Sequence, residues 1–201
     1  YLGSMAGKSI ANVVSGKVNP SGKLPFSFPV RLEDNGAHSF GAISYPGDSI
    51  NQEYLEDILV GYRWHDTKKI PARYSFGHGL SYTSFDYGKP VASAKTIGSD
   101  ESLTITIPVR NTGDRDGKET VQLYIGDDKA SVLRPLKELK GFEKIELAPG
   151  EEKTVNFTIT PDALKFYDDK TASWVAEPGK FRAYIGSSST DIRATVPYAP
   201  Q

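Results

Sequence analysis

After about residue 88, apolar and polar positions alternate along the chain, which is the pattern of β-strands with one buried face. The alternation is clear in five stretches, at residues 103–109, 121–125, 155–159, 181–185 and 192–196. Further strands are expected at 139–147 and around Trp174, with turns such as NTGDRDG and LAPGE between strands. About seven short strands without long helices between them predict a mainly β fold, an antiparallel β-sandwich of immunoglobulin-like type.

The part before residue 88 has a different period. Between residues 3 and 14 apolar residues recur at spacings near three and four, which predicts a helix that ends before Gly16. The prolines and the glycine of NPSGKLPFSFP then predict a turn and an extended segment. The short apolar run ILVGYRW, residues 58–64, predicts a strand or its edge. Within the β-rich part, Thr160 as N-cap and Pro161 as first helical residue predict a helical interruption.

Composition narrows the class of protein without indicating an activity. The 201 residues are 38% hydrophobic and 24% charged, with a formal net charge of −1 and no cysteine. These values indicate a globular protein without disulfides or thiolate chemistry, and without a basic surface for nucleic acid. No apolar run approaches the ~20 residues that a membrane-spanning helix needs. The opening YLGSMAG reads as the middle of a domain, so we expect a piece of a larger protein.

Aromatic side chains crowd between residues 54 and 87, where eight of the chain's 22 aromatics (9 Phe, 11 Tyr and 2 Trp) lie. Within this stretch the run YSFGHGLSYTSF, residues 74–85, combines four aromatics with two glycines and His78. Such a cluster suits either a ligand cleft or a packed interface between domains. The residues alone leave both interpretations open.

Three acidic residues near this run, Glu53, Glu56 and Asp57, are candidates for glycosidase chemistry, which needs two carboxylates. They are close neighbours in sequence, whereas a working pair flanks the sugar from opposite sides. We therefore predict that they are solvated loop charges.

Other chemical motifs are incomplete. His38, His65 and His78 match no metal-binding spacing, and His78 between two glycines is expected to be structural. GSMAG has methionine where a nucleophile elbow needs serine. NTGDRDGKE, aligned as a calcium loop, has Thr112 and Leu123 where acids are required. We predict no catalytic residue, no cofactor and no metal in this chain.

Four long stretches, in the same order along the chain, resemble the C-terminal portion of a glycoside hydrolase family 3 enzyme of the β-glucosidase type. They are IANVVSGKVNPSGKLPFSFP, YLEDILVGYRWHDTKKIPARYSFGHGLSYTSF, VRNTGDRDGKETVQLYIGDDKASVLRPLKELKGFEKIELAPGE and DALKFYDDKTASWVAEPGKFRAYIGSSSTDIR. The chain departs from the usual pattern of the family at Asp57, His65 and Ser75, where glycine, an aromatic residue and proline are common. These departures leave the subfamily open.

The resemblance implies a division into the end of an α/β sandwich domain at 1–52, an aromatic-rich linker at 53–88, and a fibronectin type III-like domain at 89–201. It also implies a retaining, exo-acting β-glycosidase whose nucleophilic aspartate and acid/base glutamate precede this chain. We therefore expect the chain to be inactive alone. Its expected partners are the upstream catalytic domains and the carbohydrate substrate. Export to the periplasm or the outside of the cell is likewise only implied.

Peripheral sugar contacts are expected from Trp64, Tyr74 and His78, which lie in the aromatic run or beside it. Two other functions stay open at this stage. The chain can be a non-catalytic carbohydrate-binding module that stacks sugars on exposed aromatics, or a purely structural fibronectin-like module. The purely structural alternative explains residues 89–201 but not the resemblance of the part before them.

Overall fold

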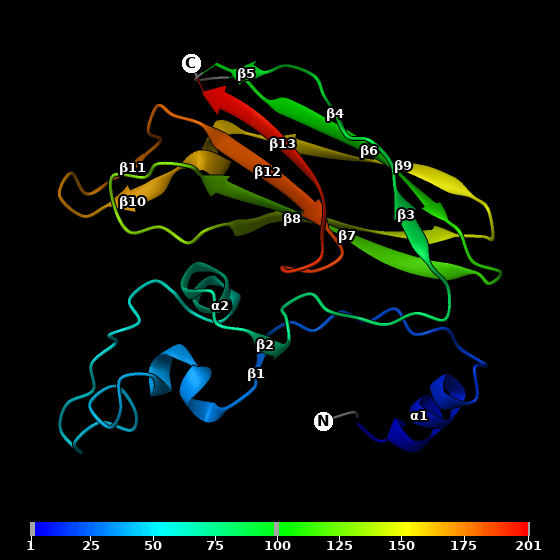
Figure 1. Cartoon of the computed structure of the whole chain (residues 1–201), viewed down its shortest axis with the longest axis horizontal. Coiled ribbons are helices and arrows are strands. Elements are labelled where there is room, and N and C mark those ends of the chain that lie inside the picture. The colour runs from blue at the N-terminus through cyan, green and yellow to red at the C-terminus, as the bar shows by residue number, and fades with distance from the viewer. Residues whose placement is uncertain (1–2, 99–100, 201) are drawn as a thin grey trace.

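The computed structural model of the chain describes residues 3–98 and 101–200. Two β-sheets form a sandwich, and a second layer of helices, turns and extended chain lies along one side of it (Figure 1). The sandwich contains most of the second half of the chain, whereas the other layer contains the residues before about 80. The prediction of a mainly β, immunoglobulin-like sandwich is confirmed.

The larger sheet has five strands in the order β5 (Thr96–Ile97), β13 (Ile192–Pro200), β12 (Phe181–Gly186), β7 (Gly117–Asp127) and β8 (Glu138–Leu147). Neighbouring strands are antiparallel except for the short parallel pair β5 and β13. In the second sheet β6 (Leu103–Asn111) pairs with β9 (Glu152–Ile159) along most of its length, and also with β3 (Phe85–Tyr87) and β4 (Val91–Ala92).

The core of the sandwich lies between the two sheets, and the predicted alternation fills it. Along β6, Leu103, Ile105, Ile107 and Val109 are buried, and the residues between them are not. The corresponding alternate positions of the other long strands are buried in the same core: Val121, Leu123, Ile125, Val155, Phe157, Ile159, Phe181, Ala183 and Ile185. Since the chain has no cysteine, this packing is what joins the two sheets.

Two short strand pairs lie outside the main sheets. Strands β1 (Phe28–Pro29) and β2 (Ala72–Tyr74) pair in the second layer, and β10 (Phe166–Asp168) and β11 (Ser173–Val175) form a hairpin at one end of the sandwich (Figure 1). Strand β11 includes the strand predicted around Trp174. The predicted helical interruption after Thr160 is a 3₁₀ helix, Pro161–Leu164, although the Thr160 side chain makes no capping hydrogen bond.

The helices of the second layer are short. Helix α1 (Ala6–Val14) confirms the helix predicted within residues 3–14, and none of its residues is buried. Helix α2 (Tyr62–Lys68) and two 3₁₀ helices, Leu32–Asp34 and Gly36–His38, make up the rest. No helix among the residues that the structure describes is long and apolar enough to cross a membrane.

The strand predicted at residues 58–64 is wrong, because helix α2 begins within that run. Gly61 has a positive φ of 62°, a conformation that favours glycine, and it turns the chain directly before the helix. The β-forming residues Ile58 and Val60 are exposed, whereas Trp64 and His65 of the helix are buried. Tertiary packing of these two side chains therefore outweighs the local β propensity.

Shortening a core side chain tests the role of the sandwich interior. We expect Ile107→Ala to lower the free energy of unfolding by about 2–5 kcal/mol, because Ile107 is fully buried between the sheets. Val91→Ala, at a side chain that is 63% exposed, is the control and should change stability by no more than ~0.5 kcal/mol. Urea unfolding of both variants measures the difference, and equal midpoints would contradict this assignment of the core.

Candidate functional site

Strand β7 is buried on both of its faces between Val121 and Gly126, which marks the junction between the two layers. Val121, Leu123 and Ile125 point into the sandwich, so Gln122 and Tyr124 point out of it. In a sheet with one solvated face these two residues would be exposed. Instead Gln122 is 3% exposed and Tyr124 is fully buried, because residues 62–78 cover this side of the sheet.

An aromatic cluster joins helix α2 to this face of the sheet. The Tyr62 ring stacks on Phe76 with 4.7 Å between centroids, and it meets the edge of Tyr124 at 5.8 Å. The Tyr62 hydroxyl also accepts a hydrogen bond from the Leu139 backbone N–H over 2.8 Å. Burial raises the pKa of Tyr124 well above its ordinary value, so its hydroxyl stays protonated and donates to Gln122 Oε1.

The run YSFGHGLSYTSF passes between the extended segment at residues 22–24 and strand β7. Gly77 N–H donates to the Leu24 carbonyl over 2.7 Å, and the Gln122 side-chain amide donates to the Gly77 carbonyl over 3.2 Å. A Cβ on Gly77, whose φ is 79°, would lie 2.1 Å from Gln122 Oε1, and one on Gly79 would lie 2.4 Å from the Gly22 carbonyl oxygen. Only glycine permits this approach, which agrees with the expected tight backbone path.

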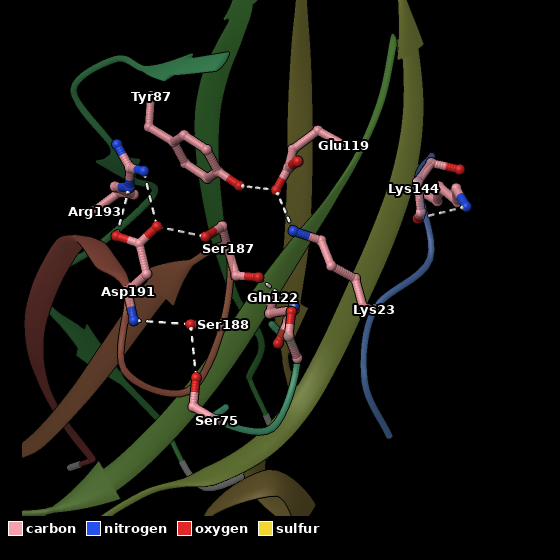
Figure 2. A network of polar contacts seen from close by, with 12 residues as sticks. Lys23, Ser75, Tyr87, Glu119, Gln122, Lys144, Ser187, Ser188, Asp191 and Arg193 are labelled. Atoms are coloured by element: carbon pink, nitrogen blue, oxygen red, sulfur yellow. Dashed lines mark hydrogen bonds and ion pairs between the residues drawn. The ribbon is translucent and has the colours of Figure 1, made fainter. Parts of the chain in front are cut away.

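Charged groups secure the same junction, as Figure 2 shows. Lys23, from the extended segment, forms an ion pair of 3.1 Å with Glu119 of β7, and both side chains are largely buried. The Tyr87 hydroxyl donates to the same Glu119 carboxylate over 2.9 Å. Burial, and then the negative charge of Glu119, raise the pKa of Tyr87 far above its ordinary value. The tyrosine is therefore a permanent donor to this carboxylate.

A loop of the sandwich, residues 187–191, completes the network in Figure 2. Asp191 accepts hydrogen bonds from Ser187 Oγ at 2.6 Å and from Arg193 at 2.8 Å. Burial alone would raise the pKa of Asp191, but these donors hold it below its ordinary value. Ser75 reaches this loop through a 3.4 Å hydrogen bond to Ser188 Oγ. The loop therefore binds the aromatic run from the side of the sandwich.

A second buried ion pair joins helix α2 to the sandwich. Lys137 Nζ lies 2.6 Å from Asp66 Oδ2, and each side chain is only 7% exposed. Burial raises the pKa of Asp66 above its ordinary value, although the hydrogen bond and the charge of Lys137 oppose that rise. Arg63 of the same helix pairs with Glu138 over 3.1 Å. Two ion pairs thus attach helix α2 to Lys137 and to Glu138 at the start of strand β8, in addition to the contacts of Tyr62.

The three predicted sugar contacts have different surroundings. Trp64 is 5% exposed, and its indole N–H donates to the Asp34 carbonyl over 3.1 Å. Tyr74 is about half exposed and lies against His78, with 5.4 Å between ring centroids. The structure thus brings Tyr74 and His78 together and leaves little of the Trp64 ring accessible. As sugar contacts, all three stay predictions.

The prediction of solvated charges is wrong for one of the three acids. Glu53 and Asp57 are exposed, but Glu56 is 8% exposed and accepts a 3.5 Å hydrogen bond from Ser44 Oγ. His65 lies on helix α2 rather than on a strand, and its Nδ1 lies 3.0 Å from the Ile70 carbonyl oxygen. Across the described ranges, no group of three His, Cys, Asp or Glu side chains is placed to hold a metal ion.

The sequence pattern does not predict several residues of the junction. Gln122 lies on strand β7 at a position that alternation assigns to solvent, Glu119 is a charged residue at a position that alternation assigns to the core, and Lys137 and Asp66 are 71 residues apart. One signal was present, because Tyr124 is a large aromatic residue on the outward face of a strand. An outward aromatic residue on a central strand indicates that another element covers it.

The Lys23–Glu119 pair can be tested by removing its cation. We expect Lys23→Met to destabilise the protein by about 3–5 kcal/mol, because it leaves the Glu119 carboxylate buried without a cation. Adding Glu119→Gln should recover part of this loss, since a neutral amide still accepts from Tyr87. Lys118→Met, at an exposed pair with Glu146, is the control and should cost under ~1 kcal/mol. Thermal unfolding that ranks the two lysine variants equally would refute the role of Lys23.

The Lys137–Asp66 pair predicts a pH dependence. In Lys137→Met the pKa of Asp66 rises further in the folded state, so the folded protein takes up a proton at a pH where the unfolded chain does not. Stability relative to the wild type should therefore be lowest near pH ~7 and recover as the pH falls toward ~4. Chemical denaturation across this range measures it. A deficit that stays constant with pH would show that Asp66 does not titrate in the variant.

Two domain families match this chain. Residues 1–82 match the glycosyl hydrolase family 3 C-terminal domain, and residues 119–189 match a fibronectin type III-like domain. Over 98% of its length the chain is 63% identical to a β-glucosidase of Bacteroides ovatus, and over 96% it is 47% identical to thermostable β-glucosidase B of Acetivibrio thermocellus. It spans 26% and 25% of the lengths of these relatives.

Solved structures give the same relationship. A family 3 β-glucosidase of Bifidobacterium adolescentis superposes with a TM-score of 0.89 at 36% identity, over 96% of this chain and 28% of that protein. A β-glucosidase of Kluyveromyces marxianus gives a TM-score of 0.85 at 38% identity, over 97% and 22%. The resemblance read from the sequence is confirmed. The chain belongs to glycoside hydrolase family 3 and corresponds to the C-terminal portion of its β-glucosidase-type members.

Proposed function

We propose that the whole protein is a retaining, exo-acting β-glucosidase that hydrolyses terminal β-linked glucosides. Support for the activity comes from the relatives, since those that match this chain at 63% and 47% identity are named β-glucosidases. Other relatives, at 39% and 40% identity, are named exo-α-(1→6)-L-arabinopyranosidases of Bifidobacterium. The glucoside is preferred here because the more similar relatives carry that name.

The catalytic carboxylates belong, in this proposal, to the upstream part of the protein. A retaining mechanism uses a nucleophilic carboxylate and an acid/base carboxylate about 5–5.5 Å apart on either side of the bond that breaks. Glu53 and Asp57 are exposed, and Glu56 is buried against Ser44. None of the three has the environment of such a pair, so no catalytic residue is assigned to this chain.

The role of this chain is to hold the preceding domain and the fibronectin-like domain in a fixed arrangement. The observation that carries this proposal is the burial of strand β7 on both faces, with Gln122 covered by Gly77 of the run at residues 74–85 and Tyr124 by Tyr62 of helix α2. The proposed division at residues 52 and 88 places this run in the linker. A linker that packs this closely fixes the angle between the domains on either side of it.

The exposed apolar surface indicates where the upstream part lies. Most of the exposed large hydrophobic side chains that the structure describes belong to residues 5–60, and Ile50, Val14 and Tyr54 are among the most exposed. Helix α1 has no buried residue at all. Apolar surface of this extent marks an interface. We assign this apolar surface to contact with the upstream catalytic domains. In this proposal Tyr74 and His78 lie at its edge nearest the substrate, and Trp64 contributes less because its ring is largely buried.

The activity is tested by comparing the full-length protein with the 201-residue chain. The full-length protein should release phenol from an aryl β-glucoside and give the β-anomer of glucose first, by NMR. The chain alone should show no turnover, because it lacks both catalytic carboxylates. Turnover by the chain that disappears in Glu53→Gln or Glu56→Gln would place the active site here. Initial release of the α-anomer would rule out retention.

A further inference from the structure

Two aromatic side chains stand exposed on the hairpin of β10 and β11, at one end of the sandwich. Tyr167 and Trp174 are directly opposite each other in the strand pairing, with 5.7 Å between ring centroids and planes at 72°. They are 54% and 66% exposed, whereas their neighbours Phe166 and Val175 on the other face of the hairpin are partly buried. Core packing accounts for Phe166 and Val175 but not for the exposed pair.

The aromatic pair lines a groove of about 620 Å³, which lies within the usual range of small-molecule sites. We call it the hairpin groove. Its other walls are the loop between β7 and β8, which contributes residues 132–135, and residues 57, 58 and 63 near the start of helix α2. In Figure 1 the hairpin lies at the end of the sandwich, well apart from helix α1.

One wall of the hairpin groove is a guanidinium group held in place. The Arg134 side chain is 8% exposed, lies over the Phe166 ring at 5.5 Å and donates to the Leu164 carbonyl over 3.1 Å. Its other contacts are Asp127, at 3.5 Å, and Glu138, at 3.6 Å. A cation this buried cannot change rotamer freely, so the groove presents hydrogen-bonding groups in fixed positions.

Glu138 extends this arrangement toward the opening of the groove. Its carboxylate also pairs with Arg63 at 3.1 Å and with Lys140 at 3.5 Å, and it is 17% exposed. Fixed donors and an acceptor therefore lie side by side in one groove with the aromatic pair. A hydroxyl group is both a donor and an acceptor, so a ligand with several hydroxyls can use both kinds of partner.

The charges that line the hairpin groove balance. Four lining side chains are acidic, namely Asp57, Glu138, Asp168 and Asp169, and four are basic, since Lys165 joins the three already named. A groove without an excess of either sign does not favour an anionic or a cationic ligand. Exposed aromatic faces, by contrast, favour a ligand with flat apolar C–H surfaces. A neutral sugar ring combines such a surface with hydroxyls.

We propose that the hairpin groove is a non-catalytic binding site for a neutral carbohydrate chain. A sugar ring lies against Trp174 and Tyr167, and its hydroxyls bond to Glu138, Arg63 and Lys140. This site goes beyond the proposed glucosidase activity, because it binds a saccharide without cleaving it. The choice of a glucan as probe rests on the proposed function, whereas the site itself does not.

The test is affinity electrophoresis of the full-length protein in native gels containing a soluble neutral β-glucan. The wild type should be retarded. Trp174→Ala and Tyr167→Ala should each need a glucan concentration about tenfold higher or more for the same retardation, as expected for the loss of a stacking face. Phe142→Ala, which removes an aromatic side chain that is 68% exposed on β8 outside the groove, is the matched control and should keep wild-type retardation. An anionic polygalacturonate should not retard the wild type.

Retardation that survives in both hairpin variants, or that Phe142→Ala also removes, would overturn the site. So would hairpin variants that lower the melting temperature of the full-length protein while binding is unchanged. That result would assign Tyr167 and Trp174 to a contact with the upstream domains. Hydrolysis of an aryl β-glucoside should be unchanged in both hairpin variants. A protein that binds glucan at the groove but hydrolyses no aryl glucoside would refute the proposed activity and leave this site standing.

Discussion

The arrangement of the two layers depends on the burial of strand β7 from both sides. The inward side chains of β7 join the two sheets, and its outward side chains, Gln122 and Tyr124, are covered by the second layer. Burying one large apolar side chain contributes about 1.5–3 kcal/mol, so Tyr124, Tyr62 and Phe76 together give the second layer a substantial part of its stability. Among the residues of this layer that the structure describes, few hydrophobic side chains are buried, namely Leu59 and Trp64, and the sandwich supplies the surface on which the layer packs.

The two buried ion pairs determine how the layers are aligned rather than how strongly they bind. A buried pair gains little net free energy, because removing both charges from water costs about as much as their attraction returns. A shifted alignment, however, would leave Lys23, Glu119, Lys137 or Asp66 buried without a partner, which is costly. The aromatic cluster therefore supplies the attraction, and the ion pairs select one alignment from the many that aromatic packing tolerates.

The sequence predicted the sandwich well and the junction only in part. Alternation identifies strands whose two faces differ, which is why β6 and β9 were predicted correctly. It gives no sign that Gln122 is buried, since the Gly77 carbonyl to which it donates lies 45 residues away, and for Tyr124 the sign is its large aromatic ring on an outward face. Residues 58–64 were misread because their β propensity is local, whereas the burial of Trp64 and His65 depends on the whole fold. The glycines of the aromatic run correctly predicted a tight backbone path, because the position of Gly77 requires a positive φ and has no room for a Cβ.

Aromatic density alone does not distinguish an interface from a ligand site, but exposure does. The crowding of aromatics at residues 54–87 is compatible with an interface and with a ligand site. In the structure, Tyr62 and Phe76 of that stretch pack inside the junction. The pair on the hairpin of β10 and β11 lies in a stretch with ordinary aromatic content, yet most of the surface of Trp174 remains open. Packing in the junction therefore explains much of the aromatic crowding at residues 54–87. The exposure of Tyr167 and Trp174, which composition does not single out, is not explained by packing.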